Sequence, residues 1–199
     1  MEASKQNKLK RELVNISQRC GAQGWCPGVH GNTSVIDSNL KQVYIKKTGA
    51  DLNRLKLKDI LTVDLNGNIL KGDGKPSMEM TFHLGIYKVR KDAGAVIHVH
   101  SPFATAYAVA GIKIPMVTEA AKLILIDVPL LPNAAPGSTE LAAMVVDGFK
   151  DLQVKAVVLG EHGIVAIGGT LENAYHTASL VEDTAKVALL SSLLKRQTS

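Results

Sequence analysis

The sequence predicts an α/β fold in which strands and helices alternate around one mixed sheet. Short runs rich in β-branched residues alternate with longer segments whose apolar residues recur every three to four positions. Gly, Pro, Asn and Ser gather between these segments, as is typical of turns. No internal repeat, linker or low-complexity tract interrupts the 199 residues. We therefore expect a single domain that spans residues 1–199.

The first part of the chain predicts one helix and four strands. Apolar residues at helical spacing predict a helix over 5–20, and the Gly- and Pro-rich segment 21–31 predicts a loop. Four β-rich runs follow, at 32–36, 42–46, 60–64 and 68–70. Asn66-Gly67 lies between the last two runs and is a strong signal for a tight hairpin turn.

The rest of the chain predicts four helices and four more strands. Ser77 follows Pro76 and is a good N-cap for a helix that extends to about residue 90. The segment 116–131 is mixed, and we expect a helical turn near Glu119 and a strand near 126–129. The other expected elements are strands at 93–100, 156–159 and 164–167 and helices at 102–110, 140–148 and 171–194.

Composition limits the classes of function. The hydrophobic fraction is 46% and the charged fraction 21%, as in ordinary soluble proteins, and no apolar run reaches the roughly 20 residues of a membrane span. The polar N-terminus lacks the apolar core of a secretory signal, so we expect a cytoplasmic protein whose Cys20 and Cys26 stay reduced. The net charge is +5, but the basic residues are scattered and aromatic residues make up only 4%. This pattern argues against nucleic-acid binding and suits a small anionic substrate.

His98 and His100 are the most informative residues of the chain. Side chains two positions apart on a strand point to the same face, so both imidazoles emerge side by side. Ser101-Pro102 then ends the strand, and binding sites collect at strand ends in α/β proteins. Two imidazoles on one element and a third from elsewhere match a zinc site with one open position, although other divalent metals accept the same ligands.

Three other histidines compete with His162 for the role of third ligand. Gly160 and Gly163 flank Glu161-His162 and allow a tight turn that projects the His162 ring. The competitors are His30, His83 and His176. We expect His176 to be packed within the last helix. His83 lies four residues after Glu79 on one helix face, and we expect it to orient Glu79 or to line the site.

Glu79 and three short loops complete the candidate site. Glu79 lies in the first turn of its predicted helix, where it could be an ordinary surface carboxylate or a general base beside a Lewis acid. Gly31-Asn32, Thr48-Gly49 and Ser77 each offer a hydroxyl or amide group with exposed backbone N–H groups. Individually these are turn residues, but together they could bind a phosphate.

Five motifs together resemble the class II aldolase/adducin family in order and spacing, from about residue 8 to residue 194. The motifs are Gly31-Asn32-Thr33-Ser34, Thr48-Gly49, Lys75-Pro76-Ser77-Met78-Glu79, Ala95-Val96-Ile97-His98-Val99-His100-Ser101 and Glu161-His162-Gly163. The pattern is most similar to the L-fuculose-1-phosphate aldolases within this family. The resemblance implies a three-layer α/β/α fold with a mixed, mainly antiparallel sheet. It also implies a homotetramer whose active sites lie between subunits.

The resemblance also implies a role for each motif residue. His98, His100 and His162 would bind one Zn²⁺ per subunit, with Glu79 as the catalytic base and a further metal contact. The residues that would bind the substrate phosphate are Gly31, Asn32, Thr48, Gly49 and Ser77. The implied reaction is the reversible cleavage of a phosphorylated ketose, similar to L-fuculose 1-phosphate, to dihydroxyacetone phosphate and an aldehyde.

The chain departs from the fuculose aldolase pattern at three points. Met78 replaces a second serine, so one hydroxyl on the phosphate side is absent. Glu119 stands where a tyrosine reaches the neighbouring subunit's site, and the sequence stops before a tail that carries a second tyrosine. These departures leave the aldehyde and its proton donor open. Glu79 itself argues against the related epimerases and decarboxylases, which carry Asp and Lys at this position.

Two alternatives come from the same resemblance. Gly24-Trp25-Cys26-Pro27 is similar to a segment of the methylthioribulose-1-phosphate dehydratases, which also begin with enolisation of a ketose phosphate. An adducin-like binding module would keep the fold without catalysis. Adducin-type domains lack the metal histidines, so the complete set in this chain favours an enzyme.

Overall fold

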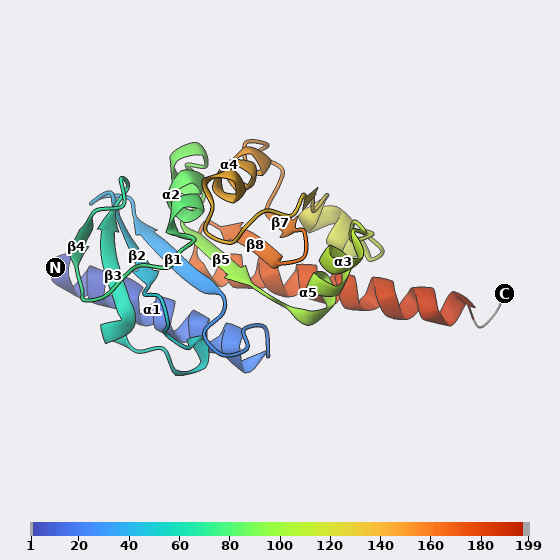
Figure 1. The fold of residues 1–199 in the computed structure, drawn as a ribbon, viewed down its shortest axis with the longest axis horizontal. Helices are drawn as coiled ribbons and strands as arrows, with labels where there is room; N and C mark the ends of the chain where they lie inside the picture. Colours follow the sequence, from blue (N-terminus) through green and yellow to red (C-terminus); the bar gives the residue numbers. More distant parts are fainter. Residues whose placement is uncertain (1, 197–199) are drawn as a thin grey trace.

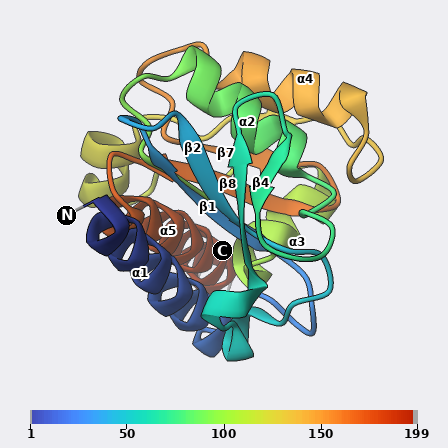
Figure 2. The same cartoon turned by 90° about the vertical axis from the view of Figure 1, so that its left-hand side faces the viewer.

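The computed structural model describes residues 2–196 and contains an eight-stranded sheet between two layers of helices (Figures 1 and 2). The strand order is β4-β3-β2-β1-β5-β8-β7-β6, and only the β6–β7 pair is parallel. The strands are β1 (Asn32–Asp37), β2 (Gln42–Lys46), β3 (Ile60–Asp64), β4 (Ile69–Lys71), β5 (Ala95–Val99), β6 (Leu130–Leu131), β7 (Ala156–Leu159) and β8 (Gly163–Gly168). The predicted α/β/α fold with a mixed, mainly antiparallel sheet is confirmed.

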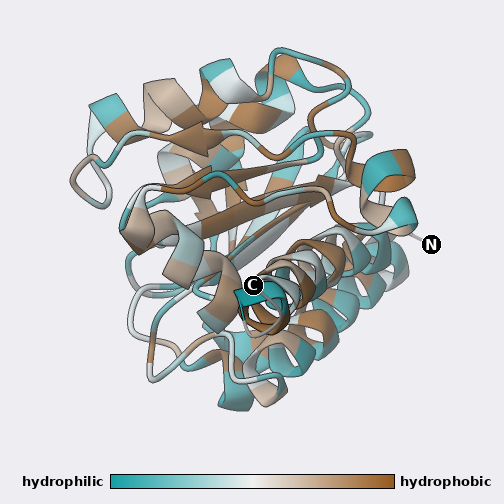
Figure 3. Cartoon of the chain, turned by 90° about the vertical axis from the view of Figure 1, so that its right-hand side faces the viewer, coloured by the Kyte–Doolittle hydropathy of each residue, from teal (hydrophilic) through white to brown (hydrophobic). Residues whose placement is uncertain are grey.

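Two apolar clusters attach the helices to the two faces of the sheet. α1 (Glu2–Ala22), α3 (Pro102–Ala110) and α5 (Leu171–Arg196) cover one face, and α2 (Met80–Val89) and α4 (Thr139–Gly148) cover the other. Alternate residues of β5 serve the two clusters, since Ile97 faces α5 while Val96 faces α2. Figure 3 shows this segregation, with apolar strands inside and polar residues on the outer helix faces. The same alternation directs the side chain of His98 towards the α2 layer.

The β5 terminus brings distant segments of the sequence together. Because β5 runs antiparallel to both of its neighbours, its C-terminal end lies beside the first residues of β1 and β8. Asn32 is paired with His98, and Val99 is paired with Ile164. The C-terminal end of β2 reaches the same edge, because β2 is antiparallel to β1. The motifs at 31–34, 48–49, 95–101 and 161–163 therefore meet at one end of the central strands.

Two predicted elements differ from the structure. The helical turn expected near Glu119 is present and continues as a π-helical turn, Ala121–Leu125. The strand expected at 126–129 is absent there: Ile126 adopts a left-handed conformation with φ 62°, and the short strand β6 begins only at Leu130. Leu125 and Val128 are fully buried, so the apolar pattern reflects packing under a turn rather than strand pairing. α2 begins at Met80, with Glu79 rather than Ser77 in the cap position. The Ser77 amide donates to the Lys46 carbonyl, which ties Ser77 to β2 and delays the helix.

Two short 3₁₀ turns, Leu52–Arg54 and Leu57–Asp59, were not predicted and connect β2 to β3. The other elements agree with the sequence-based expectation to within a few residues at their ends. Along the described part of the chain, no helix combines the length and apolar character needed to cross a lipid bilayer.

Candidate functional site

His98 is held in one tautomer by the neighbouring strand. Its side chain is fully buried, and Nδ1 lies 2.9 Å from the carbonyl oxygen of Ile164 on β8. A carbonyl oxygen only accepts hydrogen bonds, so Nδ1 carries the proton and donates it. The lone pair of Nε2 is therefore left free, as required of a histidine that binds a metal ion through this atom.

His100 and His162 converge on the same point. The Nε2 atoms of His98 and His100 are 3.1 Å apart, and the three ring centroids lie 4.8 to 4.9 Å from one another. One candidate ligand atom from each ring lies within 4.8 Å of the others. His162 reaches this position through a tight turn in which Glu161 has a φ of 56°. Gly163 is required beside it, because a Cβ there would lie 2.5 Å from the Val99 carbonyl oxygen.

Glu79 brings a buried carboxylate to the three imidazoles. Its Oε2 lies 3.2 Å from His98 Nε2, and its Oε1 lies 3.5 Å from His162 Nε2. Oε2 also accepts a 2.8 Å hydrogen bond from the Asn32 amide. Burial opposes the charged form of Glu79, but the attraction of His98 and the Asn32 donor outweigh it and lower the pKa of the carboxyl. Glu79 is therefore a carboxylate at neutral pH.

This donor set fits a divalent cation. Two buried polar atoms beside it, Glu79 Oε1 and His162 Nδ1, have no hydrogen-bond partner among the described residues. Burial and the neighbouring His98 lower the pKa of His100 to about 3 and that of His162 to about 4. Both imidazoles are thus neutral near pH 7 and can bind a metal without first losing a proton. Three neutral imidazoles and a carboxylate suit zinc and several other divalent metals.

The predicted phosphate residues line the same cavity as the histidines. This cavity measures about 440 Å³ and contacts Glu79, His100 and His162. The predicted phosphate residues that also line it are Gly31, Asn32, Thr48, Gly49 and Ser77. The loop before β1 is closely packed, since a Cβ on Gly31 would lie 2.6 Å from Cys26 Sγ and 2.9 Å from the His98 carbonyl oxygen. The structure therefore places His100, His162 and the loops of the predicted phosphate site around one space.

Lys46 also lines the cavity and was not predicted from the sequence. Its side chain is buried, and its Nζ donates to the carbonyl oxygens of Val29 (2.6 Å) and Gly31 (2.8 Å). No carboxylate of the described residues lies within ion-pair distance of it, and burial lowers the pKa of its ammonium. A lysine at the end of a strand reads as a solvated residue. The only sequence signal for the burial of Lys46 was the two-residue alternation of the strand, which puts Lys46 on the same face as the buried Tyr44.

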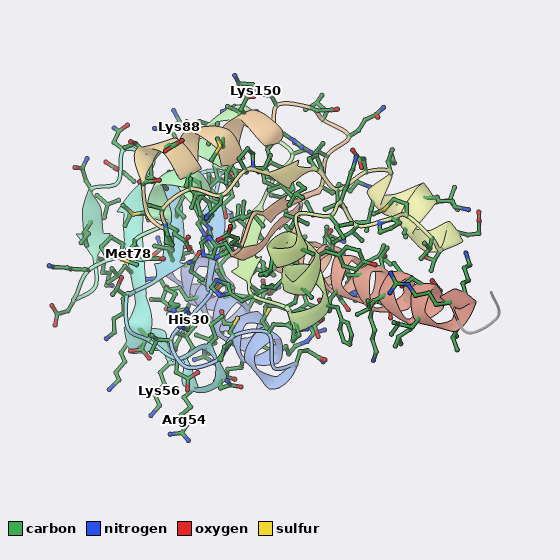
Figure 4. The ribbon with its side chains drawn as sticks, turned by 45° about the vertical axis from the view of Figure 1, so that its right-hand side comes forward. His30, Arg54, Lys56, Met78, Lys88 and Lys150 are labelled. Atoms are coloured by element: carbon green, nitrogen blue, oxygen red, sulfur yellow. The ribbon has the colours of Figure 1, made fainter. Side chains whose placement is uncertain are left out.

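The accessory residues take different positions. His83 is fully buried behind Asn32 and does not line the cavity. His30 and Met78, labelled in Figure 4, are exposed residues that line it, and the His30 ring lies 5.3 Å from that of His100. Glu119 is exposed and paired with Lys122, away from the cavity of its own chain.

His176 corrects one expectation. We expected its side chain to be packed within the last helix, but it is 65% exposed and pairs with Glu172 one turn earlier, at 3.1 Å. Tyr175 and Thr177 on either side are the buried residues of this turn. His176 faces solvent because the inward stripe of α5 passes through its neighbours, and it takes no part in the histidine cluster.

The fold and site together define a three-layer α/β/α protein with a three-histidine centre and a buried carboxylate at one end of its sheet. The chain belongs to the class II aldolase and adducin family, because the sequence profile of the "Class II Aldolase and Adducin N-terminal domain" matches residues 11–189. The family resemblance found from the motifs is thereby confirmed, as is the prediction of a class II lyase at the level of the family.

Relatives with assigned names agree with this placement. An L-fuculose phosphate aldolase of Methanococcus maripaludis is 34% identical over 184 residues, which cover 92% of this chain and 98% of the relative. A 5-deoxy-D-ribulose 1-phosphate aldolase of Bacillus thuringiensis is 29% identical over 90% of this chain and 84% of the relative. A solved L-fuculose 1-phosphate aldolase superposes with a TM-score of 0.86 at 31% identity, over 94% of this chain and 87% of the other.

Proposed function

We propose that this chain is a zinc-dependent aldolase that reversibly cleaves a ketose 1-phosphate to dihydroxyacetone phosphate and an aldehyde. The observation that carries the proposal is the position of Glu79, whose carboxylate oxygens lie 3.2 and 3.5 Å from two of three convergent imidazoles. The cavity beside it continues to the loops that we assign to the phosphate. The names of the relatives favour a ketose similar to L-fuculose 1-phosphate as the substrate.

We assign His98, His100 and His162 as zinc ligands, with Glu79 close enough to be a fourth. A divalent cation at this point supplies Lewis acidity that stabilises negative charge as it develops on the substrate oxygens. The protein contributes the orientation, because the Ile164 carbonyl fixes the ring of His98 and the turn at Glu161 fixes that of His162.

Glu79 is the residue that we assign to proton transfer. In the cleavage direction the C4 hydroxyl loses its proton, the C3–C4 bond breaks, and its electron pair remains with the dihydroxyacetone phosphate half. A proton must then reach C3, and in the reverse direction a proton must leave this carbon. Glu79 serves both directions because it is buried, ionised and held by Asn32 on the cavity wall.

The loop end of the cavity is assigned to the phosphate. Gly31, Asn32, Thr48, Gly49 and Ser77 supply amides and hydroxyls, and Met78 contributes only backbone at its position. Lys46 adds a buried cation without a carboxylate partner beneath the same loop. A buried charge is costly unless it is paired. A phosphate dianion in this cavity would pair with the Lys46 ammonium, so that each charge compensates the other.

We also propose a homotetramer with active sites between subunits. Exposed apolar side chains are typical of protein–protein interfaces. Several lie on or just after α3, on the π-helical turn and at the end of α5, and α5 packs against both of the other elements. These exposed residues are Val109, Ile112, Leu123, Ile124, Leu190 and Leu194. In Figure 1 the end of α5 projects beyond the sheet, where another subunit could pack against it. Glu119 lies beside this region and is our candidate for a contact with a neighbouring site.

The test is product analysis with purified protein. Zinc-loaded protein is incubated with L-fuculose 1-phosphate and with 5-deoxy-D-ribulose 1-phosphate, and dihydroxyacetone phosphate is measured with a coupled reductase assay. Release of the triose phosphate by the wild type and its loss in Glu79→Gln support the proposal. No triose phosphate from either sugar would contradict it, and conversion of 5-methylthioribulose 1-phosphate without triose release would identify a dehydratase instead.

A further inference from the structure

A chain of buried side chains lies behind Glu79 and ends far from the cavity. Glu79, His83 and Tyr87 recur every four residues at the start of α2 and along it, and Asn32 and Ser34 alternate on β1. Four residues of helix rise by about 6 Å and two residues of strand by about 6.6 Å, so the two series match when the elements lie side by side. Asn32 therefore fits between Glu79 and His83, and Ser34 fits between His83 and Tyr87.

Each adjacent pair in this series is within hydrogen-bond distance. Asn32 Nδ2 lies 2.8 Å from Glu79 Oε2, and Asn32 Oδ1 contacts His83 Nε2. Ser34 Oγ lies 2.7 Å from His83 Nδ1 and 2.8 Å from the Tyr87 hydroxyl. We call these five residues the α2–β1 chain. All are buried, and the most exposed of them, Glu79, has 6% of its surface accessible.

The direction of every hydrogen bond follows from the carboxylate end. An ionised carboxylate only accepts, so the Asn32 amide group faces Glu79 and its carbonyl faces His83. His83 Nε2 must then donate, which makes Nδ1 the acceptor of the Ser34 hydroxyl. The Ser34 oxygen in turn accepts from Tyr87. Four donors, on Asn32, His83, Ser34 and Tyr87, thus point in one direction, towards the carboxylate.

We propose that Tyr87, Ser34 and His83 are positioning residues that hold Asn32 in the one amide orientation that donates to Glu79. If the amide turned over, its carbonyl oxygen would face the carboxylate at 2.8 Å and repel it. The chain prevents this because His83 in its Nε2–H form can only donate to Asn32. The His83 ring is also fixed by Phe82, which stacks on it with ring centroids 4.8 Å apart and meets His98 edge-on.

The α2–β1 chain is suited to orienting the Glu79 carboxylate rather than to transporting protons. Burial and the nearby His98 hold the pKa of His83 well below its usual range, so His83 stays neutral. Burial likewise raises the pKa of Tyr87, which ends the chain as an un-ionised phenol. Tyr87 is 3% exposed, so the chain offers no exit for a proton. Its function is therefore to fix the direction of the Glu79 carboxylate.

This inference rests on the proposed function, and its first test uses the exchange half-reaction. Zinc-loaded variants are incubated with dihydroxyacetone phosphate in D₂O, and loss of the C3 proton signal is followed by NMR. We expect His83→Leu to lower the exchange rate and kcat about 10- to 100-fold while KM and zinc content stay near wild type, because a misplaced catalytic group costs rate rather than affinity. Ser34→Ala should give a smaller loss, and His83→Gln should recover part of the rate through its amide N–H.

The matched control removes a buried hydroxyl of α1 that contacts the opposite face of β1. Ser17 on α1 lies 2.6 Å from the Thr33 hydroxyl, is fully buried and does not contact the α2–β1 chain. Ser17→Ala should lose stability comparable to Ser34→Ala and keep the wild-type exchange rate. Wild-type rates in His83→Leu and Ser34→Ala, or an equal loss in Ser17→Ala, would overturn the proposal.

A second measurement does not depend on the reaction. Nitrogen-15 NMR of histidine-labelled protein, assigned by loss of the signal in His83→Leu, should show His83 as a neutral Nε2–H tautomer. An Nδ1–H tautomer or a protonated ring at pH 7 would contradict the positioning role. If the wild type acts on no ketose phosphate, the proposed function fails while this tautomer still decides whether the chain is oriented as we infer.

Discussion

The histidine end of the cavity (His98, His100, His162 and Glu79) consists of side chains at the ends of strands and a helix. The loop end (Gly31, Thr48, Gly49 and Ser77) consists largely of backbone in turns. At the histidine end, hydrogen bonds orient the reacting side chains themselves: Asn32 donates to Glu79, and His98 donates to the Ile164 carbonyl. The loop end is held by main-chain contacts such as Thr48 N to the Lys75 carbonyl, with Lys46 beneath it.

This difference has a consequence for function. A site made of side chains loses its chemistry when one residue changes, because each group has a separate role at the reacting atoms. A site made of backbone amides distributes its binding energy over several contacts, none of which a side-chain substitution removes. Changes at the histidine end should therefore reduce kcat strongly, and changes at the loop end should mainly raise KM.

The largest effect is expected from loss of a metal ligand. His162→Ala should lower bound zinc, measured by elemental analysis, and reduce turnover by at least about 10⁴-fold, because metal binding and charge stabilisation are lost together. His176→Ala is the matched control, since this exposed histidine lies outside the cluster. Full zinc content in His162→Ala would show that the third ring is no ligand.

The second effect isolates the base. Glu79→Gln keeps the size of the side chain and an oxygen for Asn32 while it removes the proton acceptor. We expect kcat to fall by about 10²- to 10⁴-fold with bound zinc retained. Steady-state kinetics together with zinc analysis checks this. Near-normal turnover would mean that another group moves the proton.

The histidine end could be predicted because its chemistry lies in residue types. The spacing of His98 and His100 on one strand, and the glycines around His162, indicated a metal site. The predicted boundaries of the strands around them agree with the structure to within two residues. The sheet edge that joins them follows from the antiparallel order β1-β5-β8, which local patterns do not encode. The resemblance to a family implied that the three rings share one site, but the strand order itself came from the structure.

Other features depend on tertiary contacts and could not be predicted. The burial of Lys46 results from the loop that covers it, and a strand-end lysine gives no local sign of this. Ile126 was assigned to a strand because of its apolar neighbours, but it follows a π-helical turn, and its neighbours Leu125 and Val128 are buried without strand pairing. His83 and Glu79 share a face by their spacing, but Asn32 between them comes from a strand 51 positions before His83. Such contacts are set by the packing of α2 on β1.

The third effect tests the loop end. Lys46→Met should raise KM for the phosphorylated ketose and the dissociation constant of inorganic phosphate about 10- to 100-fold, the range expected for a lost hydrogen bond between charged groups. kcat should change less, and Lys46→Arg should recover part of the affinity. Lys75→Met is the control, because Lys75 is exposed on the adjoining loop and does not line the cavity. Unchanged phosphate binding in Lys46→Met would remove Lys46 from the site.

The smallest effect concerns the metal-free protein and pH. The pKa values of His100 and His162 are lowered to about 3 and about 4, whereas an unfolded histidine has a pKa near 6.5. Between these values the unfolded chain binds more protons than the folded chain, so the free energy of unfolding rises with pH across this window. Urea unfolding of metal-free protein at pH 7 and pH 5 should therefore show lower stability at pH 5. The decrease should be smaller in the double variant His100→Gln, His162→Gln and unchanged in His176→Gln. A pH dependence that persists in the double variant would place its source outside the histidine end, and the two ends of the cavity would then not differ in their response to acid.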